Sequence, residues 1–224
     1  MKVKHFRWVF AGLVALVFTG GFVLPGATMG ISSEWSDGRY RFAAGTAPWA
    51  LGFAVFLVSV YIVYMDAPPV APGKPLPGLF RRFVAFWLDF ALAMSIVTPV
   101  AGILPVIAEW RRTGVFEWSF ERDAPAAGDL PTVMLATTFG FAALLFYYAV
   151  PVFRGRPSPG ACIVGYQVVP VDGKPLTFRR ALLRTLLGFV AVCGAPAAPF
   201  VRRESKQGRF WLDTMFGTRA TLLD

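Results

Sequence analysis

Four long stretches of the chain are almost entirely apolar, and most polar residues lie in the segments between them. A helix rises about 1.5 Å per residue, so roughly 20 apolar residues are needed to cross the hydrocarbon core of a bilayer, which is about 30 Å thick. Four stretches approach or exceed this length: Trp8 to Leu24, Trp49 to Met65, Phe83 to Ala108 and Thr132 to Phe153. The pattern predicts an all-α polytopic membrane protein with four transmembrane helices.

The ends of these stretches also suit a bilayer. Aromatic rings that can sit at the level of the lipid headgroups stand near them, at Trp8, Trp49, Trp110, Tyr147 and Tyr148. The first stretch has the basic start and apolar core of a signal peptide as well. Because its apolar run exceeds the usual length of about 7 to 15 residues, we prefer a transmembrane helix.

A fifth apolar run, Thr185 to Val201, contains glycine and proline and is flanked by arginines. Without a crossing here, five of the 22 Lys and Arg residues lie outside: Arg39, Arg41, Arg111, Arg112 and Arg122. If this run crossed the membrane, the basic residues that follow it would also lie outside. Nearly all of the charge asymmetry that orients membrane proteins would then be lost. We therefore expect a re-entrant or broken segment with both termini cytoplasmic, and a plain fifth crossing is the alternative.

The polar segments predict how the chain is divided. Residues 67–78 form a proline-rich cytoplasmic linker, which cannot be helical because proline lacks a backbone donor and blocks the preceding turn. We expect an N-terminal pair of transmembrane helices in residues 1–66 and a second membrane domain in residues 79–224.

The segment from Arg154 to Arg184 is a long cytoplasmic stretch with strand signals. It contains the β-prone run Tyr166 to Val171, an Asp172-Gly173 turn signal and a second extended piece, Lys174 to Phe178. We expect these pieces to form a small cytoplasmic β-hairpin. The alternation of polar and apolar residues in Thr218 to Leu222 indicates a further strand.

Composition agrees with a lipid environment, because 56% of the residues are apolar and only 16% are charged, against about 25% in an average soluble domain. The net charge of +9 does not indicate a nucleic-acid partner, since the basic residues lie between apolar runs instead of clustering on a soluble face. We expect the partner to be the lipid bilayer with its anionic headgroups. Five arginines of the cytoplasmic segment are placed to contact them: Arg154, Arg156, Arg179, Arg180 and Arg184.

Few residues are suited to metal or nucleophilic chemistry. The chain has two cysteines, Cys162 and Cys193, and one histidine, His5, which lies among basic residues near the N-terminus. This set cannot assemble a disulfide framework, a zinc cluster or a Ser-His-Asp site. We expect no metal, no cofactor and no enzymatic activity.

One acidic residue, Asp89, lies inside a predicted span, roughly 9 to 10 Å below its cytoplasmic start. An ionised side chain at this depth costs several kcal/mol unless it is paired or faces water, which makes Asp89 a candidate functional group. Arg82 lies two helical turns earlier on nearly the same face, and Asp213 in the C-terminal tail is a second candidate partner. Asp89 is either a protonatable or cation-coordinating group in a polar cavity, or half of a structural ion pair. For Asp213 we favour a structural role.

Several short motifs around these residues occur together and in order. They are the run Arg81 to Asp89, the run Gly155 to Gly160, the run Gly165 to Val169 with Asp172-Gly173, the run Arg180 to Arg184, and Leu212-Asp213 with Gly217-Thr218. Together they resemble the RDD family, a bacterial membrane family named after one arginine and two aspartates. The resemblance implies that Arg82, Asp89 and Asp213 are these three residues, and it implies an integral membrane protein whose activity the family alone does not define.

The leading interpretation is a bacterial inner-membrane protein with a role in transport or membrane permeability. In this interpretation Arg82, Asp89 and Asp213 form an ion or proton site at the cytoplasmic side of the helix bundle. A chain of this length is short for a transporter with paired repeats, so transport would need a homo-oligomer. The alternative is a non-enzymatic scaffold or assembly factor, in which the three residues are structural and the cytoplasmic loop recruits a protein partner. An intramembrane aspartyl protease is disfavoured because Asp213 lies outside any clear span.

Overall fold

The structure is a computed structural model, and it describes residues 8, 9, 11–13, 15, 16, 30–66, 77–123, 129–194 and 210–223. Three sequence predictions lie wholly or largely outside these residues. They concern the first span, Trp8 to Leu24, the proline-rich linker up to residue 76, and the end of the fifth apolar run after Gly194. These three stay predictions.

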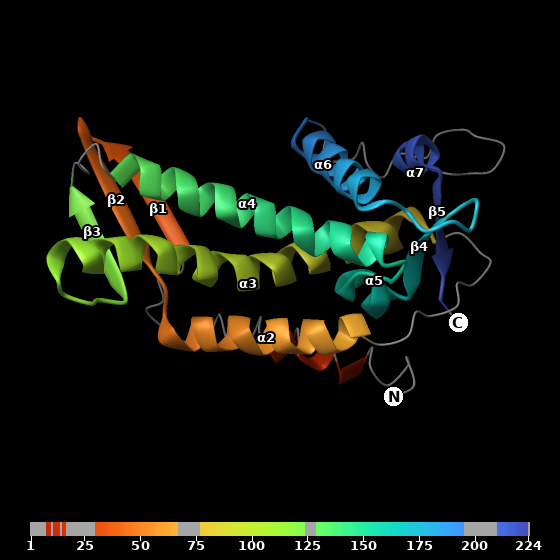
Figure 1. Cartoon of the computed structure of the whole chain (residues 1–224), viewed down its shortest axis with the longest axis horizontal. Helices are drawn as coiled ribbons and strands as arrows, with labels where there is room; N and C mark the ends of the chain where they lie inside the picture. Colours follow the sequence, from red (N-terminus) through yellow and green to blue (C-terminus); the bar gives the residue numbers. More distant parts are fainter. Residues whose placement is uncertain are drawn as a thin grey trace. The chain divides into compact units, whose positions relative to one another are not determined.

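Within the described residues, three helices are long and apolar enough to cross a membrane. They are α2 (Pro48–Asp66), α3 (Leu79–Thr113) and α4 (Asp129–Phe153) (Figure 1). These helices confirm the second, third and fourth predicted spans as helices of membrane-spanning length and apolarity. At about 1.5 Å per residue, the 35 residues of α3 extend for roughly 50 Å, which exceeds the thickness of the hydrocarbon core. Residues near one or both ends of α3 therefore lie outside that core.

The chain divides into two compact units, and each of the three long helices contributes to both. The first unit comprises residues 1–14, 63–91 and 145–224, and the second comprises residues 15–62 and 92–144. The candidate site residues Arg82, Asp89 and Asp213 all belong to the first unit.

The second unit contains a three-stranded antiparallel sheet in the order β1 (Gly30–Ser36), β2 (Arg39–Gly45) and β3 (Ser119–Asp123). A two-residue turn, Asp37-Gly38, joins β1 to β2, and both of its residues have positive φ. This is the backbone that a tight hairpin requires, and Asp-Gly favours it. The sheet was not predicted, although Asp37-Gly38 is a local signal for its first hairpin.

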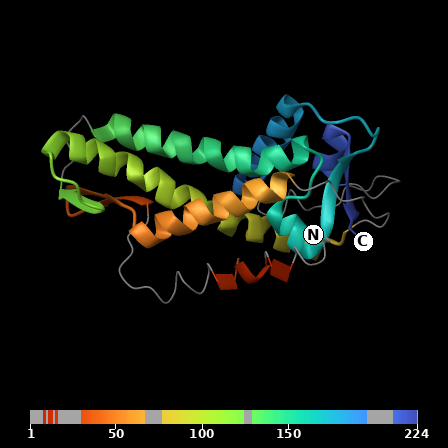
Figure 2. The same cartoon turned by 60° about the horizontal axis from the view of Figure 1, so that its bottom comes forward.

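The first unit holds the C-terminal elements. A short helix, α5 (Pro159–Val164), leads into β4 (Tyr166–Pro170), and α6 (Phe178–Gly194) follows. The last elements are α7 (Trp211–Phe216) and β5 (Thr218–Leu222), and β5 pairs antiparallel with β4. Both views of the fold place β4 and β5 side by side (Figures 1 and 2).

Small side chains allow close packing around this strand pair. Ala85 of α3, Ala161 of α5, Tyr166 of β4 and Ala220 of β5 form one buried cluster. The cluster places the strand pair and α5 against the beginning of α3. Asp89 lies one helical turn further along α3, so this packing positions the candidate site.

Two parts of the predicted fold class need correction. The chain is mostly helical but not all-α, since its described residues include two small antiparallel sheets. The predicted hairpin was wrong in its partner, because Tyr166–Pro170 pairs with Thr218–Leu222 and not with Lys174 to Phe178. The backbone N–H of Lys174 donates to the side chain of Asp172 and closes a turn, Pro175 has no N–H to donate, and α6 begins at Phe178. The strand predicted at Thr218 to Leu222 is confirmed, and it supplies the partner.

Candidate functional site

Asp213 lies between two arginines in the first unit. Arg82 Nη1 is 2.7 Å from Asp213 Oδ2, and Arg184 Nη2 is 2.8 Å from Asp213 Oδ1. The side chains of Asp213 and Arg82 are 1% and 8% exposed, so water has little access to the pair. The ring of Phe210 lies 3.8 Å from the Cζ of Arg82 and covers its guanidinium group. This set joins the beginning of α3, the first half of α6 and the short helix α7.

The local structure of α7 places Asp213 toward these arginines. Asp213 is the third residue of a six-residue helix that ends at Gly217, which has the left-handed conformation. The next residue, Thr218, donates its hydroxyl to Asp213 Oδ1 at 3.2 Å. The carboxylate therefore accepts hydrogen bonds from three side chains, and α7, β5, α3 and α6 are held together at one point.

Asp213 is ionised at neutral pH. Burial by itself would raise the pKa of Asp213, but the charges of Arg82 and Arg184 and their hydrogen bonds outweigh burial and lower the pKa to about 2. Burial also raises the pKa of Tyr166 on β4 to about 12, so this hydroxyl is neutral. The Arg82–Asp213–Arg184 set consequently carries a net charge of one positive unit.

Asp89 lies in a different environment. Its carboxylate accepts hydrogen bonds from Tyr147 Oη at 3.0 Å, from Ser158 Oγ at 2.5 Å and from the backbone N–H of Gly160 at 2.6 Å. The residue is only 2% exposed. Within the described part of the chain, no Lys or Arg side chain lies within ion-pair distance of it. The hydrogen-bond donors that these residues provide to Asp89 are all neutral.

The turn that precedes α5 fits closely against Asp89. Ser158 is the N-cap of α5 and Pro159 is its first residue, a common sequence for starting a helix. A Cβ atom at Gly160 would lie 2.5 Å from the Ala85 carbonyl oxygen and 2.8 Å from Asp89 Cγ. Only glycine fits here, because α5 approaches the backbone of α3 so closely.

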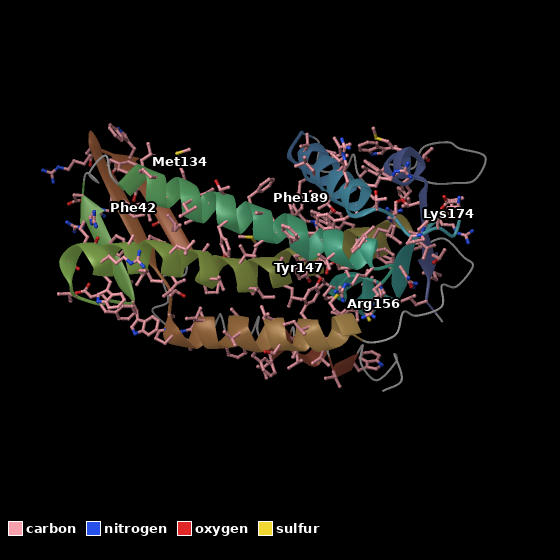
Figure 3. All side chains as sticks on the ribbon, viewed as in Figure 1. Phe42, Met134, Tyr147, Arg156, Lys174 and Phe189 are labelled. Carbon is pink, nitrogen blue, oxygen red and sulfur yellow. The ribbon has the colours of Figure 1, made fainter. Side chains whose placement is uncertain are left out.

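A cavity of about 130 Å³ lies between Asp89 and the two arginines that bind Asp213. Its wall includes Asp89, Arg82 and Arg184, and a third arginine, Arg156, from the loop after α4. The rest of the wall carries hydroxyl groups, such as those of Ser158 and Thr185, and apolar side chains, among them Phe86 of α3 and Phe189 of α6. Figure 3 shows the side chains of Tyr147, Arg156 and Phe189 in this part of the first unit.

The structure brings together only part of the predicted polar set. Arg82 is in direct contact with Asp213 and does not contact Asp89. Both Arg82 and Asp89 nevertheless line the cavity. Two of the arginines predicted to contact lipid headgroups, Arg156 and Arg184, also line the cavity. The other three, Arg154, Arg179 and Arg180, are exposed, and their contact with lipid stays a prediction.

Sequence reasoning missed the residues that hold Asp89. The sequence predicts Tyr147 and Tyr148 at the level of the lipid headgroups, but Tyr147 donates to Asp89 and Tyr148 donates to the Phe86 carbonyl oxygen. In the sequence, Ser158 and Gly160 stand out only as members of the run Gly155 to Gly160. The Ser-Pro-Gly sequence is a helix-start signal that indicates exposed N–H donors, and this signal could have suggested an acidic partner.

Comparison with known proteins identifies the family. The model of the RDD family matches residues 76–217, which include the residues of the site described above except Thr218. No curated protein and no solved structure shows significant similarity to the chain. The family match covers more than half of the chain and agrees with the predicted family. This chain belongs to the RDD family.

Proposed function

We propose that this protein transports an ion across the membrane, with Asp89 as the group that takes up and releases a proton. In this proposal the protein is not an enzyme, and it works in a bacterial inner membrane with both termini in the cytoplasm. The distribution of Lys and Arg residues supports this orientation. A chain of 224 residues is short for a transporter with paired repeats, so we infer a homo-oligomer.

The environment of Asp89 is the observation that supports transport most directly. A carboxylate in a membrane-spanning helix costs about 3 kcal/mol or more, and such residues usually mark ion or proton pathways. Asp89 lies within the apolar span of α3, on the wall of a cavity, and its hydrogen bonds come from neutral donors. A carboxylate whose charge no cation neutralises can change its protonation state without breaking an ion pair.

Asp213 has a different role in this proposal. Its charge is balanced by two arginines, and protonating it would leave both arginines buried beside a neutral group. We assign the Arg82–Asp213–Arg184 set to holding the cytoplasmic ends of the helices together.

The proposal is tested by measuring flux in liposomes. The purified protein is reconstituted with a pH-sensitive dye in the lumen, and an ion gradient is imposed. We expect Asp89→Asn to reduce proton-coupled flux at least tenfold, because an amide cannot take up a proton in this pH range. Glu117→Gln is the matched control, since Glu117 is an exposed acid outside the site. Equal flux in wild type and Asp89→Asn would exclude Asp89 as the proton-carrying group.

A scaffold function is the second candidate, and one observation favours it. Asp89 binds the N-terminal end of α5 through Ser158 and Gly160, an arrangement that also fixes a loop in place without any transport. In this case the cytoplasmic segment from Arg154 to Arg184 would recruit a protein partner. A scaffold predicts no flux in the wild-type protein and a large loss of thermal stability in Asp89→Asn.

A further inference from the structure

The cavity beside Asp89 has more hydrogen-bond donors than acceptors on its wall. Arg82, Arg156 and Arg184 all line it, and each guanidinium group has five N–H donors. Among the described residues, each of the three donates one hydrogen bond, from Arg82 and Arg184 to Asp213 and from Arg156 to the Tyr64 carbonyl oxygen. The Nε atom of Arg184 is buried and has no acceptor among these residues. Most of the donor capacity around the cavity therefore has no acceptor in the described part of the chain.

The acidic residues do not balance these donors. Asp213 neutralises one of the three arginines, and Asp89 directs both of its oxygens to Tyr147, Ser158 and Gly160. With both acids ionised, the three arginines on the wall together with Asp89 and Asp213 still carry one net positive charge. A ligand that complements it must bring several acceptor oxygens and negative charge.

We infer that this cavity is a binding site for an oxyanion, either a free phosphate-like ion or the phosphate of a lipid headgroup. The planar guanidinium group matches the oxygens of such an anion, because its N–H groups can bind two oxygens at once. A volume of about 130 Å³ equals that of roughly four water molecules in the liquid, which is enough for a phosphate-sized group. Phe86 and Phe189 on the wall would face the apolar part of a lipid.

An oxyanion is thus the ligand class that we infer for the proposed transport site. Oxyanion binding rests on the proposed function only if the bound oxyanion is also the transported ion. Binding itself is measured at equilibrium and needs no flux. Saturable oxyanion binding without flux would support the site and contradict the transport role.

Two variants and one control test the site by different routes. Arg156→Gln removes one guanidinium group and leaves the Arg82–Asp213–Arg184 set intact. Gly188→Leu fills the cavity without changing its charge, because Gly188 lines it and, of the described residues, an added Cβ would meet only Leu212, at 3.9 Å. Arg81→Gln is the control, since Arg81 is an exposed arginine next to Arg82 and is not part of the cavity wall.

Inorganic phosphate is titrated into the protein in neutral detergent, and heat is recorded. In parallel, thermal unfolding is measured in nanodiscs of phosphatidylcholine with and without phosphatidylglycerol. We expect saturable phosphate binding that both cavity variants weaken at least tenfold and Arg81→Gln leaves unchanged. Stabilisation by phosphatidylglycerol that Gly188→Leu abolishes, without binding of free phosphate, would identify a lipid headgroup as the source. The inference would be overturned if neither phosphate nor phosphatidylglycerol bound, or if binding were equal in wild type and both cavity variants.

Discussion

At the scale of single residues, the two arginines around Asp213 make the fold sensitive to acid. The pKa of Asp213 is lowered from 3.8 to about 2 in the folded chain, because Arg82 and Arg184 overcome the opposing effect of burial. The folded state therefore binds this proton less tightly than the unfolded state. The resulting stabilisation, about 2 kcal/mol, is complete above about pH 4 and is lost as the pH falls through about 2.

We expect Asp213→Asn to lower the free energy of unfolding at pH 7 by about 3 to 5 kcal/mol, because it leaves Arg82 and Arg184 buried without their counter-ion. The difference between wild type and variant should narrow between pH 4 and pH 2, as the wild-type carboxyl becomes protonated. Unfolding is followed by tryptophan fluorescence in mixed micelles with increasing dodecyl sulfate. Asp172→Asn, at an exposed turn, is the control. A difference that is constant from pH 7 to pH 2 would contradict this account.

At the scale of elements, α2 contacts the loop that holds Asp89, although α2 precedes the residues that match the family. The hydroxyl of Tyr64 donates to the Pro157 carbonyl oxygen, and Arg156 Nη1 donates to the Tyr64 carbonyl oxygen at 3.4 Å. Pro157 directly precedes Ser158, which donates to Asp89. We therefore expect α2 to position the loop from residue 155 to residue 160.

Replacing Tyr64 with phenylalanine should loosen this loop together with the first turn of α5. The loss of one buried hydrogen bond is worth about 1 kcal/mol, which corresponds to roughly fivefold faster amide exchange if the loop opens locally. Hydrogen–deuterium exchange of Gly160 and Cys162, whose N–H groups bind Asp89 and the Ser158 carbonyl oxygen, measures the effect. Ser59→Ala is the control on the same helix, since the Ser59 hydroxyl donates to the Val55 carbonyl oxygen one turn earlier. Unchanged exchange in Tyr64→Phe would remove the positioning role of α2.

At the scale of the whole molecule, the sequence predicted the features that depend on local patterns and missed those that depend on distant pairing. Apolar runs predicted α2, α3 and α4 because lipid requires long apolar helices. The cost of burying a charge identified Asp89, and helical spacing identified Arg82 as its candidate partner. Asp213 was the second candidate partner, and the motifs agree with all three. The hydrogen-bond donors to Asp89 were not predicted, because Tyr147 and Gly160 lie 58 and 71 residues from Asp89 along the chain. The partner of β4 was missed for the same reason, since an adjacent segment looked like the simpler hairpin.

The pairing of β4 with β5 bears on how many times the chain crosses the membrane. The two strands are hydrogen-bonded along their length, and an open strand pair does not occur in the hydrocarbon core, so both strands lie on one side of the membrane. The chain between them must cross an even number of times. The apolar run Thr185 to Val201 lies in this interval, and the pairing predicts that it does not make a single crossing.

Single-cysteine labelling tests this topology in a background without Cys162 and Cys193. Cysteines replace Asp172, just after β4, and Arg219, within β5, because both residues are exposed. An impermeant maleimide is applied to right-side-out and inverted vesicles. We expect Asp172→Cys and Arg219→Cys to react from the same side. Among the described spans, α4 alone separates Glu117 from β4, so Glu117→Cys should react from the opposite side. Reaction of the two strand positions from opposite sides would show that the run crosses once, and it would be incompatible with the β4–β5 pairing that places Asp213 beside Arg82 and Arg184.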